Sequence, residues 1–237
     1  IRIPNILFNE TNNKISLIDF GLIIEKNDVF NFSKRWYFFG ISHNGNGYLL
    51  NQGNVQSKSV HYQYPSENYL LGIIYMCIFK SKNMNNYYTY KNQYKENYII
   101  YIQNLYTFFR SRSTFIKTDI ETYYDSVFNE FNITDKIFIH YDNKEKENYI
   151  IDKANTIFNP NKTDIYCLGY VLSQISLIDY PYYVRDKLVE LSLKMINYNV
   201  IIRPDMNNVI ADIKNLIVIK QGGKSEKVEK VEKVEKV

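Results

Sequence analysis

Two short β-like runs near the start of the chain place the strongest constraint on how it can fold. They cover residues 5–8 and 15–18, and the polar residues 9–14 between them suit a short connection. The sequence therefore predicts a β-hairpin. Asn5 begins the first run and Asp19 follows the second, so the hairpin brings their side-chain oxygens to the same end.

Oxygen ligands converging at one point are typical of a site for a hard cation. Magnesium keeps several of its waters and takes only one or two protein oxygens when it also holds nucleotide phosphates, which fits the pair of Asn5 and Asp19. Gly21 closes the sequence Asp-Phe-Gly and gives the backbone freedom to turn the carboxylate inward. We therefore predict a magnesium site at this end of the hairpin.

The rest of the chain is predicted to be mainly helical. Residues 21–63 carry no regular apolar pattern, and we expect a long surface loop there. Helical apolar spacing follows in six segments, namely 67–79, 95–112, 118–131, 162–176, 182–196 and 204–217. The expected fold class is therefore mainly α with a short β-hairpin.

Composition excludes several classes of protein. The chain has 237 residues, 45% of them hydrophobic, and a net charge of +4, so it suits a packed globular protein and predicts neither a nucleic-acid nor a membrane partner. Cys77 and Cys167 stand far apart in apolar surroundings, which favours reduced cysteines in a cytoplasmic protein. Residues 221–237 end in Glu-Lys-Val repeats and are predicted to be a solvated low-complexity tail.

Four motifs, taken in order, resemble those of eukaryotic-type protein kinases. Residues 4–8 resemble the end of the catalytic loop, and residues 17–21 resemble the Asp-Phe-Gly motif that follows it at a similar separation. Residues 164–169 resemble the start of the central buried helix of the family. Arg203, before Pro204, resembles the arginine that precedes its last helix. The resemblance covers residues 1–220 and implies a kinase-like C-terminal lobe without the N-terminal β lobe.

The resemblance implies roles for the residues of the hairpin. Asp19 would hold the magnesium ion that bridges the phosphates of ATP, and Asn5 would take the second metal position. Arg2 falls where most serine/threonine kinases carry a lysine that contacts the transferred phosphate. Leu7 would lie under the adenine ring and Ile18 beside it, although core packing explains such apolar residues equally well.

The same resemblance places the catalytic aspartate immediately before Ile1, outside the sequence. The Gly-rich loop and the strand lysine of the family belong to an N-terminal lobe that the sequence also lacks. We therefore expect the natural chain to continue upstream, with the missing lobe and a protein substrate as partners. We expect the fragment alone to be inactive.

The segment between the second and third motifs departs from the family. Residues 64–67 match in part the Ala-Pro-Glu that ends a kinase activation segment, so Glu67 is expected to form a buried ion pair with Arg203; alternatively it only begins a helix. Asp164 is expected to be structural, either in its kinase role or as a carboxylate near a helix start. Residues 68–160 would then form a helical insert that is atypical of the family and packs on the lobe or recruits a partner.

Three functions remain open at this stage. The first is a serine/threonine kinase that transfers the γ-phosphate of ATP to a protein hydroxyl, with tyrosine specificity left open by Arg2. The second is a pseudokinase-like binding scaffold, which retention of Asn5 and Asp19 argues against. The third is a small-molecule phosphotransferase of related fold. The richness in Asn, Ile, Lys and Tyr resembles kinase-like chains of large DNA viruses and some protists, which would act in the host cytoplasm.

Overall fold

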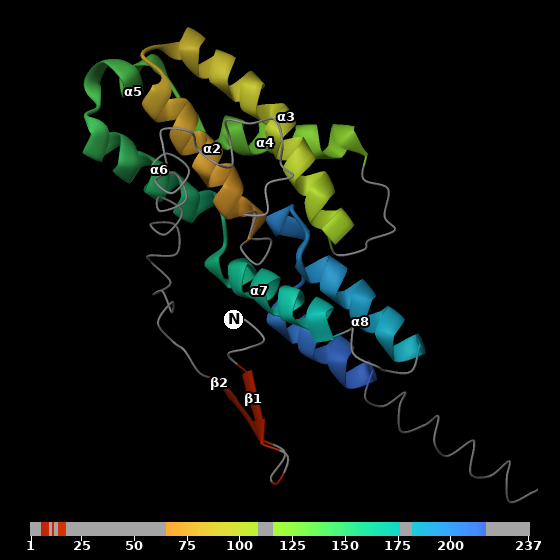
Figure 1. Cartoon of the computed structure of the whole chain (residues 1–237). Coiled ribbons are helices and arrows are strands. Elements are labelled where there is room, and N and C mark those ends of the chain that lie inside the picture. Colours follow the sequence, from red (N-terminus) through yellow and green to blue (C-terminus); the bar gives the residue numbers. More distant parts are fainter. Residues whose placement is uncertain are drawn as a thin grey trace, which may run out of the picture.

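The computed structural model shows a mainly helical protein (Figure 1). It describes residues 6–9, 11, 14–17, 65–108, 116–175 and 182–216. Strands β1 (Ile6–Asn9) and β2 (Lys14–Leu17) pair antiparallel, with Ile6 opposite Leu17 and Asn9 opposite Lys14. The expected loop at 21–63 and the tail at 221–237 lie outside the described residues.

Seven labelled α-helices, one 3₁₀ helix and a final unlabelled helical segment follow in the described part of the chain. Their bounds are α2 (Ser66–Lys80), α3 (Met84–Phe108), α4 (Lys117–Phe131), α5 (Asp135–His140), α6 (Asn143–Ile157), α7 (Pro160–Ile175), α8 (Tyr182–Met195) and η3 (Val200–Ile202). Residues 206–216 are also helical. The predicted mainly helical character is therefore confirmed.

Helix α2 lies at the centre of the first helical group (Figure 1). Every residue from Ser66 to Ile78 is buried, because the helix is apolar on nearly all sides and contacts α3 and α6. Helix α4 packs against both α3 and α6 and closes the group. Helices α2, α3, α4 and α6 thus form a helical bundle.

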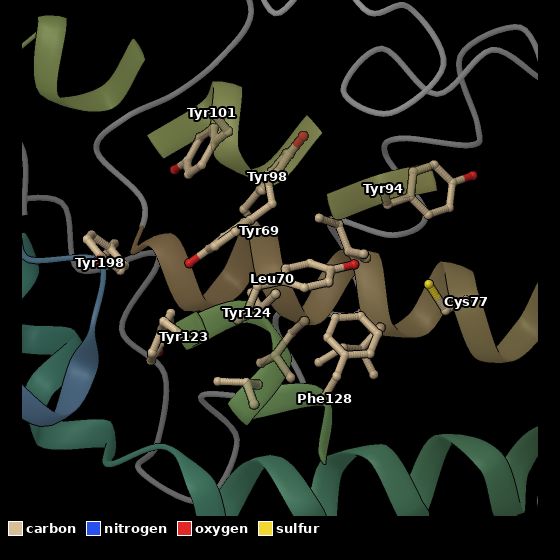
Figure 2. Packing of buried hydrophobic residues seen from close by; sticks show 14 of the residues in the cluster. Tyr69, Leu70, Cys77, Tyr94, Tyr98, Tyr101, Tyr123, Tyr124, Phe128 and Tyr198 are labelled. Atoms are coloured by element: carbon tan, nitrogen blue, oxygen red, sulfur yellow. The ribbon is translucent and has the colours of Figure 1, made fainter. Parts of the chain in front are cut away.

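Tyrosines fill much of this bundle (Figure 2). The rings of Tyr69 and Tyr101 stack with their centroids 4.1 Å apart, and Tyr124 stacks on Phe128 at 4.5 Å. Tyr98 lies between these pairs, with its ring centroid 5.6 Å from that of Tyr124. Ring packing of this kind buries a large apolar area while each hydroxyl still needs a polar partner.

The second helical group consists of α7, α8 and residues 206–216, and lies beyond the start of α2 (Figure 1). Helices α7 and α8 approach closely at Gly169, where an added Cβ atom would lie only 2.6 Å from Cβ of Met195. A small core of Ile165, Leu191, Met195 and Val209 joins the three segments. Glycine is required at this crossing because no side chain fits between the helices.

The two groups share one core. The main hydrophobic cluster around α2 also contains Tyr166 from α7 and Ile196, Tyr198 and Val200 from the stretch after α8. The described residues of segment 68–160 are therefore part of the same folded body as α7 and α8.

Candidate functional site

Most residues predicted to bind nucleotide and metal lie outside the described part of the chain. Arg2, Asn5, Ile18 and Asp19 belong to this group. Leu7 lies on β1 opposite Ser16. Their assignment to a nucleotide site therefore stays a prediction.

The structure brings together two of the three residues predicted to be structural. Arg203 donates from Nη1 to Oε1 of Glu67 at 2.8 Å and from Nη2 to Oε2 at 2.6 Å. Both side chains are fully buried. The ion pair expected between Glu67 and Arg203 is thus confirmed, in the forked geometry that a guanidinium forms best with a carboxylate.

Every N–H group of the Arg203 guanidinium has an acceptor. Besides the two bonds to Glu67, Nε donates to the carbonyl of Asn197 at 2.6 Å and Nη1 to the carbonyl of Lys162 at 3.0 Å. Nη2 also donates to Oγ of Ser66 at 3.2 Å. These bonds engage all five guanidinium donors, which is the condition for burying an arginine without a large penalty.

Helix α7 supplies further contacts to the pair. Oγ1 of Thr163 donates to Oε1 of Glu67 at 3.0 Å, and the ring of Tyr166 lies with its centroid 5.0 Å from Cζ of Arg203. Lys162 places its ammonium 2.5 Å from Oδ1 of Asp205 and 2.6 Å from the carbonyl of Arg203. The pair therefore ties the start of α2, the start of α7 and the segment after α8 to one another.

Burial and the neighbouring charge of Glu67 shift the pKa of Arg203 in opposite directions. Burial lowers the pKa of Arg203, but the charge and hydrogen bonds of Glu67 outweigh it and the pKa is raised overall. Burial also raises the pKa of Tyr98 and Tyr166 well above the ordinary tyrosine value. Arg203 therefore stays charged in a buried site next to neutral tyrosines.

Asp164, the third predicted structural residue, does not join this pair. Its side chain is exposed on α7, and no hydrogen bond or ion pair connects it to Glu67 or Arg203. The neighbouring Thr163 makes the contact instead. The sequence analysis assigned no role to Thr163, Ser66 or Asn197. Thr163 and Ser66 act through hydroxyls and Asn197 through its backbone carbonyl, and such contacts leave no pattern in the sequence.

Comparison of the chain with models of protein families, with curated proteins and with solved structures found no significant match in any of the three. Among the described residues, no group of three or more His, Cys, Asp or Glu side chains is placed to hold a metal. No helix in the described part has both the length and the apolar character needed to cross a membrane.

Proposed function

We propose that this chain is the C-terminal lobe of a protein serine/threonine kinase, which transfers the γ-phosphate of ATP to a protein hydroxyl with the help of Mg²⁺. The catalytic aspartate and the nucleotide-covering N-terminal lobe would come from sequence before Ile1. The lobe would act in the cytoplasm on a protein substrate.

The Glu67–Arg203 ion pair is the observation that supports this proposal most. The kinase motifs alone paired these two residues, which stand 136 positions apart in the sequence, and they form a fully buried, doubly hydrogen-bonded pair. A glutamate that only began a helix would be favoured by the helix dipole without any such partner. The pair therefore favours the kinase interpretation of Glu67 over that alternative.

The residues proposed to bind magnesium and ATP lie on or next to the hairpin. Asn5 directly precedes Ile6, and Asp19 stands two positions after Leu17, which is the residue paired with Ile6. A carboxylate and an amide oxygen are a donor set that suits Mg²⁺. When bound, the ion would neutralise charge on the nucleotide phosphates, while Arg2 would contact the transferred phosphate and Leu7 and Ile18 would line the adenine site.

Nucleotide binding by the natural protein that carries this chain tests the proposal. We expect magnesium-dependent ATP binding, measured by calorimetry, that is abolished by Asp19→Ala. Asp28→Ala, which removes a carboxylate of the same segment with no assigned role, is the matched control and should leave binding unchanged. Unchanged binding in Asp19→Ala would refute the metal role.

Phosphate transfer separates the kinase from the scaffold. Transfer of radiolabelled γ-phosphate to serine or threonine of a protein substrate is the expected result, and transfer to tyrosine alone would correct the specificity. ATP binding without any transfer would identify the pseudokinase-like scaffold instead.

A further inference from the structure

The loop that carries Arg203 is held by side chains from three helices of the bundle, two of them through hydroxyl groups and one through its ring. This loop, residues 197–203, runs from the end of α8 through η3. Oγ of Ser66 on α2 donates to the carbonyl of Tyr198 at 3.2 Å, and the N–H of Tyr198 donates to Oη of Tyr106 on α3 at 3.2 Å. Tyr123 on α4 reaches the loop through its ring, which packs against the ring of Tyr198. We call Ser66, Tyr106 and Tyr123 the loop clamp.

Ring contacts strengthen the clamp. The ring of Tyr198 meets that of Tyr123 edge to face, with centroids 5.5 Å apart, and that of Tyr106 in the same manner at 6.3 Å. Figure 2 places Tyr198 and Tyr123 at the same end of α2. Because all three rings are buried, the loop is fixed both by polar bonds and by apolar packing.

The clamp and the ion pair act on the same short stretch of backbone. Arg203 reaches the clamp through Ser66, whose Oγ accepts from Nη2, and reaches the loop through the carbonyl of Asn197. The loop makes local bonds of its own, such as the N–H of Ile201 to Oδ1 of Asn199 at 3.1 Å. The bonds at Tyr198, by contrast, come from the bundle.

We propose that helices α3 and α4 form a conformational device that sets the position of the Arg203 loop. Because the loop carries Arg203, a partner or substitution that loosens the hold of Tyr106 and Tyr123 on the loop is transmitted to the ion pair and to the start of α2. The device is built from described residues alone and does not require kinase activity.

Amide hydrogen exchange of the whole chain, resolved by residue, tests the device. The clamp variant combines Tyr106→Phe, which removes the hydroxyl that accepts from the Tyr198 N–H, with Tyr123→Leu, which removes the ring that packs on Tyr198. The readout is the amides of Ile202 and Arg203, which bond to carbonyls within the loop and lose no partner directly. We expect their exchange to speed up about fivefold or more, as loss of one net hydrogen bond implies.

Tyr124→Phe is the matched control. Its buried hydroxyl donates to the carbonyl of Lys91 at 2.8 Å, so the change removes a bond of the same kind between α3 and α4 without touching the loop. Exchange at Ile202 and Arg203 should stay at the wild-type rate. An equal acceleration in this control, or none in the clamp variant, would overturn the proposal.

A second measurement tests the link to the ion pair. Glu67→Gln should accelerate exchange at Arg203 strongly in the wild type and much less in the clamp variant, because the loop is already released there. Fully additive effects would contradict the coupling. If the double clamp variant does not fold, Tyr106→Phe alone supports the same comparison.

Discussion

Arg203 and Glu67 form a forked ion pair with both side chains fully buried, although 136 sequence positions separate them. The pair joins the first turn of α2 to the segment between α8 and the last helix. Charged groups removed from water stabilise a fold only when each is fully partnered, and this pair meets that condition through Ser66, Thr163 and two backbone carbonyls. Its consequences for stability can be measured directly.

Replacement of Arg203 by methionine should be strongly destabilising. The change leaves the Glu67 carboxylate buried without its counter-ion, and loss of one partner of a buried pair costs about 3–5 kcal/mol. Urea unfolding followed by circular dichroism measures the change. Lys187→Met, which breaks the exposed pair with Glu190 on α8, is the control and should unfold like the wild type.

The double variant Glu67→Leu with Arg203→Met should recover much of that loss, because no uncompensated charge remains in the core. A single Arg203→Met variant as stable as Lys187→Met would contradict the importance assigned to the pair.

Two glycines in helices should respond to alanine with opposite signs. At Gly169 the new methyl group would lie 2.6 Å from Cβ of Met195, so we expect a loss of about 1–3 kcal/mol from overpacking between α7 and α8. At Gly72, in α2, no atom of the described residues lies within 4 Å of the added atom, and the gain in helix propensity should stabilise the protein by roughly 0.5–1 kcal/mol. Thermal unfolding of both variants decides the point; a stabilising Gly169→Ala would rule out the close approach.

Tyr98→Phe should raise stability. The Tyr98 hydroxyl is buried and has no hydrogen-bond partner among the described residues, so removing it relieves a desolvation penalty of about 1–3 kcal/mol. Tyr149→Phe serves as the contrast, because that hydroxyl donates to the carbonyl of Phe131 at 2.5 Å and its loss should destabilise. Equal destabilisation in both variants would show that Tyr98 does have a partner.

The protein should lose stability steeply above pH 10. Burial raises the pKa of Tyr94 to about 12 and raises that of several other tyrosines further. Below pH 10 both the folded and the unfolded chain keep these protons. Above it the unfolded chain deprotonates first, so each such tyrosine lowers the free energy of unfolding by about 1.4 kcal/mol per pH unit until its folded pKa is reached.

Tyrosinate absorbance recorded together with circular dichroism checks this alkaline prediction. The buried tyrosines should ionise in the same transition in which helical signal is lost. Gradual ionisation of all tyrosines near pH 10, in a chain that stays folded, would contradict their burial.

Apolar spacing predicted several helices well, missed α5 and α6, and placed the start of α3 too late. The predicted segment 118–131 agrees with α4 at Lys117–Phe131. The start of α3 was predicted at residue 95 and lies at Met84. The missed residues are rich in Asn and Tyr, which are modest helix formers, and packing of Tyr87 and Tyr94 compensates.

The polar features differ in how far the sequence could predict them. The Glu67–Arg203 pair could be predicted because both residues stand in motifs. The capping box at the start of α6, between Asp142 and Glu145, has a three-residue spacing that can be recognised in a sequence. The loop clamp could not be predicted, because hydroxyls that bond to a distant backbone leave no pattern along the chain.

The saturation of Arg203 also defines what this residue cannot do. A guanidinium that binds phosphate or a substrate carboxylate must offer N–H groups to the incoming anion, and Arg203 has already committed each of its own to the protein. Nor could a water molecule bridge it to a ligand without displacing Glu67, Ser66 or a backbone carbonyl. Any anion bound by this chain must therefore contact other basic residues. Arg203 is a structural residue of the core.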